Sequence, residues 1–252
     1  MKIEVLYGEL ANLYGDLFNI RFLEQSLDNV TIYYTGINEK PHFTYEDVDL
    51  IYMGPMMERY QEIVIDRLKP YKEKIKELIE NEQVFLITGN AIEIFGSKID
   101  DIEGLGIFET YAKRDFSHHH NSCFIGEFEN MKIVGFKSQF SYSYNNKYPF
   151  IKTINGNGFN DNNDIEGIKY HNFFGTYLIG PILIYNPYFT KYLLKLLGHD
   201  VKLAFEEDVI DEANKNIKYR YIQGPKGDKE DIDSIGSSHT NWNYFLCWKT
   251  FN

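Results

Sequence analysis

Short apolar strands alternate with amphipathic helices through the first 96 residues, and this alternation leaves few folds open to the chain. Residues 2–7, 31–34, 50–53 and 84–87 are predicted as strands, because they are apolar, β-branched or aromatic runs that end at turn residues. Apolar residues at helical spacing follow Asp16 and recur between residues 58 and 80. The pattern predicts an α/β, flavodoxin-like fold with a mostly parallel central sheet flanked by helices.

Three loops follow the ends of these strands, at residues 7–16, 53–57 and 88–90. In a doubly wound sheet the carboxyl ends of the strands share one edge, and ligands bind there. The third loop is the most informative, because Thr88, Gly89 and Asn90 are turn residues between an apolar strand and a short apolar helix that ends near Gly96. This edge is therefore the predicted site.

The chain divides into three parts by composition. Further strand-like runs and a helix that begins at Pro187 extend the predicted domain over residues 1–220. A polar linker is predicted over 221–240, and the tail 241–252 holds five large aromatic residues, both tryptophans among them. Such a tail either anchors a partner protein or folds back on its own domain as an edge strand.

Charge and cysteine content exclude several classes of function. With 26 Lys and Arg against 37 Asp and Glu, the net charge of −11 repels nucleic acid and anionic membrane surfaces. No apolar run approaches the ~20 residues of a membrane span. Two cysteines and no export signal at the start favour a cytoplasmic location. Neither nucleic acid nor membrane is expected as a partner.

Five motifs occur in an order that resembles a known family. They are Leu13-Tyr14-Gly15-Asp16 followed by Asn19, the turn Gly54 to Gln61, the elbow Thr88 to Gly96, the segment Gly135 to Gln139, and Gly175 to Pro181 continued by Asn186-Pro187. The order resembles class I glutamine amidotransferase domains of the cobyric acid synthase type, and most closely the glutaminase subunits of lipid II isoglutaminyl synthase. The resemblance covers about residues 4–200. It implies ammonia release from glutamine for an ATP-dependent ligase, as in cell-wall lipid II amidation or cobyric acid synthesis.

The same resemblance indicates that catalytic groups are missing. The family's elbow cysteine falls on Gly89, and its histidine base falls on Ile179. A register shifted by one residue would put Thr88 at the nucleophile position instead. The family's three-glycine oxyanion loop reads Gly54-Pro55-Met56, and Pro55 has no N–H to donate. We therefore expect a catalytically degenerate binding or regulatory subunit, with a Mur-ligase-like or other ATP-dependent ligase as partner.

The expected ligand site lies around the substituted elbow. A pocket lined by Ile179 is predicted at Gly89, open to a small amide or amino acid. Its expected binding residues are Asp16, Asn19, Gly54, Thr88, Asn90, Glu93, Gln139 and Tyr177. Asp16 is also expected to cap the first helix. No cofactor is expected.

Other chemistry stays open as alternatives. The run His118 to His120 near Cys123 has metal-ligand residue types, but its spacing favours solvated loop residues over a metal site. Cys123 could replace the missing thiol of a glutaminase if its pKa were lowered. A different hydrolase or transferase reaction at the same sheet edge, using Thr88, Glu93 or Asp16, is the remaining alternative.

Overall fold

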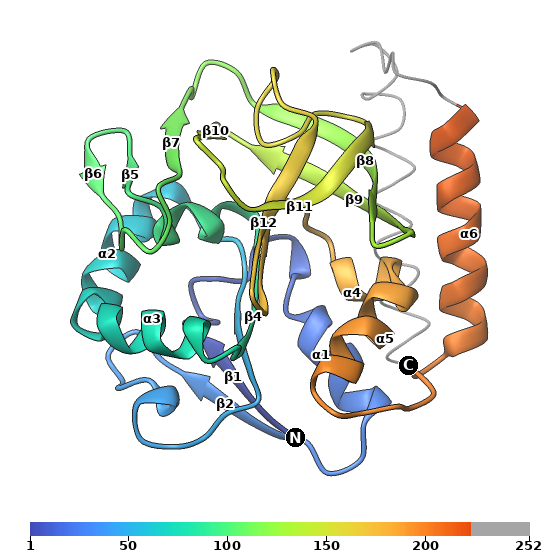
Figure 1. Cartoon of the computed structure of the whole chain (residues 1–252), viewed down its shortest axis with the longest axis horizontal. Coiled ribbons are helices and arrows are strands. Elements are labelled where there is room, and N and C mark those ends of the chain that lie inside the picture. The colour runs from blue at the N-terminus through green and yellow to red at the C-terminus, as the bar shows by residue number, and fades with distance from the viewer. Residues whose placement is uncertain (223–252) are drawn as a thin grey trace.

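A nine-stranded mixed sheet forms the centre of the molecule in the computed structural model, which describes residues 1–222 (Figure 1). Its strand order is β2-β1-β3-β4-β13-β12-β11-β8-β9. The first five strands in this order are mutually parallel: β1 (Lys2–Leu6), β2 (Thr31–Thr35), β3 (Leu50–Met53), β4 (Val84–Thr88) and β13 (Phe173–Thr176). This half confirms the α/β prediction from the apolar runs.

The other half of the sheet is antiparallel. It consists of β12 (Ile165–Tyr170), β11 (Pro149–Asn155), β8 (His120–Phe128) and β9 (Met131–Gln139). A smaller sheet contains β10 (Ser141–Tyr144), β7 (Tyr111–Arg114), β5 (Lys98–Ile99) and β6 (Ile102–Glu103). The small sheet connects to the central one through the β9–β10 turn, beside the predicted site.

Helices cover both faces of the central sheet (Figure 1). One face carries α2 (Glu58–Leu68) and α3 (Lys72–Glu80), and the other carries α1 (Phe18–Ser26), α4 (Ile182–Tyr185), α5 (Pro187–Leu196) and α6 (Glu206–Ile222). Short 3-10 helices span Leu13–Gly15, His42–Thr44, Lys69–Tyr71 and Gly89–Phe95. None of the helices in the described range has the length and apolarity needed to cross a bilayer.

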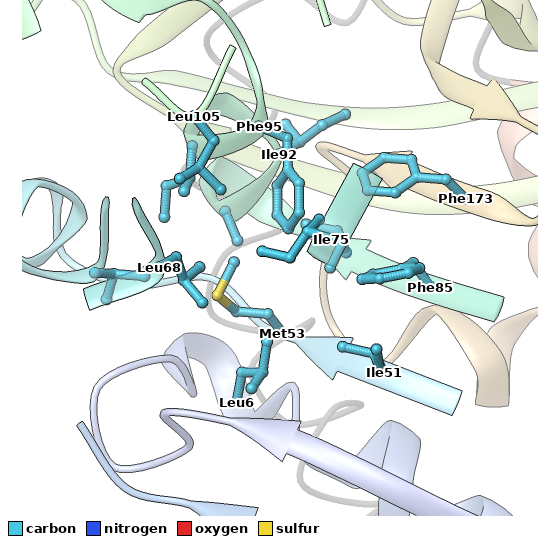
Figure 2. Packing of buried hydrophobic residues seen from close by; sticks show 14 of the residues in the cluster. Leu6, Ile51, Met53, Leu68, Ile75, Phe85, Ile92, Phe95, Leu105 and Phe173 are labelled. Atoms are coloured by element: carbon cyan, nitrogen blue, oxygen red, sulfur yellow. The ribbon is translucent and has the colours of Figure 1, made fainter. Parts of the chain in front are cut away.

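Two apolar cores result, one on each face of the sheet. Figure 2 shows the first, in which side chains from β1, β3 and β4 meet side chains of α2, α3 and the 3-10 helix after β4. Strands β3 and β4 are buried on both faces, so their sequences are continuously apolar rather than alternating. The linker and tail expected at 221–252 lie almost wholly outside the described residues.

The expected helix cap at Asp16 is wrong. Helix α1 begins at Phe18 with Leu17 as its N-cap, and no side chain caps it. The carboxylate of Asp16 points instead to distant strands, as described below.

Candidate functional site

The elbow after β4 is the centre of the predicted site. Strand β4 ends at Thr88, and Gly89 has a left-handed backbone (φ +59°), which glycine adopts without steric cost. The chain then forms the buried 3-10 helix Gly89–Phe95 rather than an α-helix. At Gly96 a Cβ atom would lie 2.6 Å from the carbonyl oxygen of Thr110, so the residue before β7 packs directly on this backbone.

The space directly beside Gly89 is filled. A Cβ atom on this residue would lie 2.5 Å from Cβ of Pro55 and 3.1 Å from Cγ2 of Ile179. Carbon atoms in contact normally stay about 3.5–4.0 Å apart. The predicted ligand pocket is therefore wrong, because the proline ring and the isoleucine fill the space in which a side chain at position 89 would sit.

Asp16 belongs to a buried network on one side of the elbow. Its carboxylate accepts hydrogen bonds from the hydroxyls of Thr88 and Tyr52 and from the N–H of Gly180 (3.1 Å). Burial raises the pKa of the Asp16 carboxyl, and the hydrogen bonds from Thr88 and Tyr52 partly oppose this. Asn19 donates to the Asp16 carbonyl (2.9 Å) and accepts from the N–H of Leu183 (2.9 Å). These contacts join the loop after β1 to the segment after β13.

Glu93 is the centre of a second buried network, on the other side of the elbow. Its carboxylate accepts from Gln61 (2.9 Å), from the hydroxyl of Tyr177 (3.0 Å) and from Ser141. Burial raises the pKa of Glu93, and it also raises that of Tyr177. Arg114 of β7 donates to Oε1 of Gln61 (2.6 Å), which ties the small sheet to α2.

The remaining predicted residues hold loops in place. The side chain of Asn90 accepts from the N–H of Met56 (3.0 Å) and donates to its carbonyl (2.7 Å). At Gly54 a Cβ atom would lie 2.7 Å from the carbonyl oxygen of Ala11, so glycine permits the close approach. Gln139 donates to the carbonyl of Ser141, while its buried Oε1 has no hydrogen-bond partner.

The eight predicted ligand residues thus gather on both sides of Gly89, but they face the protein interior. Asp16, Asn19 and Thr88 have no exposed surface, and Asn90, at 9%, is the most exposed of those with a polar or aromatic side chain. A cleft of about 450 Å³ opens nearby, after β1 and β2, between residues such as Glu9, Tyr34 and Glu39. None of the eight lines it. Apart from Gly54, which has no side chain, these residues use their side chains for hydrogen bonds within the protein.

An exposed hydroxyl and imidazole pair lies at the outer end of β9. Ser138 Oγ is 2.9 Å from the hydroxyl of Tyr14 and 2.9 Å from Nε2 of His119. The ring of His119 stacks on Phe140 at 4.2 Å between centroids. Two residues earlier on β9, the carbonyl of Phe136 accepts from the N–H of Ile179 (2.9 Å). The pair therefore lies at the same sheet edge as the elbow.

Cys123 is half-buried in β8, opposite Phe136. The hydrogen bonds of the neighbouring histidines go to Asp115, Ser138 and Tyr142 among others, and none goes to this thiol. Among residues 1–222, His, Cys, Asp and Glu side chains form no group of three that could hold a metal ion.

Sequence reasoning missed the partners that hold the two networks together. Tyr52, Gln61, Arg114 and Ser141 come from elements far apart in the chain. A signal existed for Gln61, which lies in the quoted turn motif. Lys137 was also missed: it is fully buried and forms a salt bridge with Glu166. Burial lowers the pKa of Lys137, and the adjacent carboxylate partly opposes this.

Comparison with known proteins agrees with this fold. The family model of the CobB/CobQ-like glutamine amidotransferase domain matches residues 2–186. Two relatives carry the name lipid II isoglutaminyl synthase (glutamine-hydrolyzing) subunit GatD. The one from Staphylococcus aureus is 29% identical over 233 residues, covering 84% of this chain and 96% of its own. The one from Streptococcus pneumoniae is 28% identical over 232 residues, covering 84% and 88%.

Solved structures are similar in fold. A glutamine amidotransferase from Thermotoga maritima aligns with a TM-score of 0.50 at 12% identity, over 88% of this chain and 92% of that one. A second glutamine amidotransferase aligns with a TM-score of 0.54 at 10% identity, over 78% and 99%. At these identities the likeness extends to the fold alone.

Proposed function

The chain belongs to the CobB/CobQ-like glutamine amidotransferase domain family, and we propose that it is a catalytically degenerate member that acts as a binding or regulatory subunit. One observation carries the proposal. A Cβ atom at position 89 would lie 2.5 Å from Pro55, so the family's nucleophile position has neither a thiol nor room for one.

Glutaminase chemistry needs a nucleophile, a base and donors for the developing oxyanion. Gly89 provides no nucleophile, Ile179 cannot accept a proton, and Pro55 has no N–H. Thr88 is a poor substitute, because it is fully buried and its hydroxyl donates to Asp16. Three parts of one mechanism are replaced together while the scaffold around them is intact.

The proposed role is therefore that of a binding or regulatory subunit for a partner protein. The two relatives are named as subunits of a glutamine-hydrolyzing synthase, and the family resemblance implies an ATP-dependent ligase as the ammonia acceptor. We infer a Mur-ligase-like or related ligase as the partner of this chain, in the cytoplasm. The small amide or amino-acid ligand expected from the sequence plays no part in this proposal, because Pro55 and Ile179 fill the space at Gly89.

The decisive experiment measures glutamate and ammonia release from glutamine by the purified full chain. No release above the protein-free blank is expected. Release by the parent chain would refute degeneracy, and its loss in Cys123→Ala would identify the responsible thiol. In a mixture with the ligase, size-exclusion chromatography should give a complex, and amidation should proceed with ammonium salts but not with glutamine.

A second candidate function rests on the Ser138 and His119 pair. A hydroxyl 2.9 Å from an imidazole nitrogen has the geometry of a nucleophile beside its base. The corresponding activity is a hydrolase or transferase reaction at the same sheet edge. Labelling by a fluorophosphonate probe that is lost in both Ser138→Ala and His119→Ala would support it. Ser122→Ala is the matched control, because Ser122 contacts His120 in a similar way (3.1 Å).

A further inference from the structure

A second hollow lies at the β8–β9 turn, the end of this strand pair that is opposite to Gln139. This groove, of about 560 Å³, runs between α5, α6 and the β8–β9 turn. Its apolar and aromatic lining comes from Met131 at the start of β9, Tyr188 and Tyr192 in α5, and Ile217 in α6. Half of the Tyr188 surface is exposed. The exposed ring of Tyr188 beside this hollow can pack against an aromatic occupant.

The chemistry of the groove favours an aromatic occupant over an anionic one. Two of its lysines are already neutralised, since Lys132 forms a salt bridge with Glu127 and Lys191 forms one with Glu206 (2.8 Å). These side chains offer their methylene stems to an occupant rather than net charge. Lys195 forms no salt bridge within the described part of the chain and is free to lie over an aromatic ring.

The chain itself leads to a candidate occupant. Helix α6, whose Ile217 lines the groove, ends at Ile222, about 8 Å further along the helix axis. Residues 241–252 carry Trp242, Tyr244, Phe245, Trp248 and Phe251. Eighteen residues separate Ile222 from Asn241, and a random coil of that length spans about 20–25 Å, enough to reach the groove. We propose that residues 241–252 bind in the groove between α5 and α6.

The other place for this segment near α6, the free edge of β9, is blocked. Both the N–H and the carbonyl of Val134 are taken by the side chain of Asn186, at 2.8 Å each. The carbonyl of Phe136 is taken by the N–H of Ile179. An added strand would have to displace these groups from the middle of β9, whereas the groove needs no displacement.

Tryptophan fluorescence tests the proposal on the full chain. Both tryptophans, Trp242 and Trp248, lie in the segment, so tryptophan emission reports on it alone. In the native chain the emission should be blue-shifted and protected from acrylamide, relative to the chain in urea. The double variant Tyr188→Ser/Lys195→Glu changes two exposed groove residues and should shift both signals toward the urea values, with an unchanged far-UV circular dichroism spectrum.

A matched control keeps the test specific. Lys40 lies over the exposed Tyr45 ring, at 5.6 Å, in the loop after β2. Tyr45→Ser/Lys40→Glu makes the same chemical change away from the groove and should leave the emission unaltered. The proposal is overturned if the tryptophans of the native chain are as exposed to acrylamide as in urea. It is also overturned if their protection from acrylamide is the same in Tyr188→Ser/Lys195→Glu as in the native chain. Protection that disappears on dilution, together with a dimer in sedimentation, would equally overturn it, because a second copy would then supply the segment.

Discussion

Replacing Gly89 by alanine adds one methyl group at the tightest point of the elbow. The new Cβ would lie 2.5 Å from Cβ of Pro55, which is about 1 Å inside normal contact. Pro55 cannot easily retreat, because its carbonyl accepts from the N–H of Leu13 (3.0 Å) and the next residue is held by Asn90. The methyl group and the proline ring therefore compete for one space.

Two costs add up in this variant. A non-glycine residue at φ +59° loses roughly 1–2 kcal/mol to its left-handed backbone. Overpacking against the proline ring costs about 1–3 kcal/mol more. Gly89→Ala should therefore lower the free energy of unfolding by about 2–5 kcal/mol, measured by urea unfolding followed by far-UV circular dichroism.

A double-mutant cycle separates the two costs. In the Pro55→Gly background the ring is gone, so Gly89→Ala should cost only the roughly 1–2 kcal/mol of backbone strain. The coupling between the two positions should reach about 1–3 kcal/mol. Pro70→Gly, at the exposed junction of α2 and α3, is the control and should show no coupling beyond about 0.5 kcal/mol. A loss of unfolding free energy below about 1 kcal/mol for Gly89→Ala, or an equal loss in the parent and Pro55→Gly backgrounds, would refute the reasoning.

Two further predictions concern the buried charges. Because burial raises the pKa of Asp16 in the folded state, its contribution to stability is complete below the ordinary value near 4 and is lost as pH rises through the raised value. Asp16→Asn should thus gain stability relative to the parent as the pH rises above about 4 in urea unfolding; a difference that does not change with pH would contradict the raised pKa. Lys137→Met leaves Glu166 buried without its cation and should cost about 3–5 kcal/mol. Lys137→Met/Glu166→Gln should recover most of that loss in the same assay, and no recovery would mean that packing, not charge, dominates.

The parallel half of the fold could be predicted because its signals are local. Strands β1, β3 and β4 are short apolar runs, and the helices between them repeat apolar residues every three or four positions. The order of the elements then follows from the rules for α/β sheets. The antiparallel extension was predicted only as separate strands, because pairing between distant segments leaves little trace in one sequence.

The sequence brought the eight expected residues to one end of the sheet, but it did not reveal their contacts. Asp16 was assigned to a helix cap, although its partners Tyr52 and Gly180 are 36 and 164 positions away. The filled space at Gly89 was missed for a similar reason. A glycine at this position can leave an open space or can let another side chain pack against its backbone. At Gly89 the side chain is that of Pro55, which lies 34 positions earlier and comes into contact only in the folded chain.

The side chain of Asn186 has a consequence beyond the position of α5. Edge strands with unpaired backbone groups invite other chains to pair with them and so promote aggregation. The side-chain amide of Asn186 donates to the carbonyl of Val134 and accepts from its N–H. It therefore occupies the two backbone groups to which a neighbouring strand would hydrogen-bond at this residue of β9. Together with Ile179 it ends the nine-stranded sheet, so an amide near the start of a helix helps to keep separate copies of the protein from growing into a shared sheet.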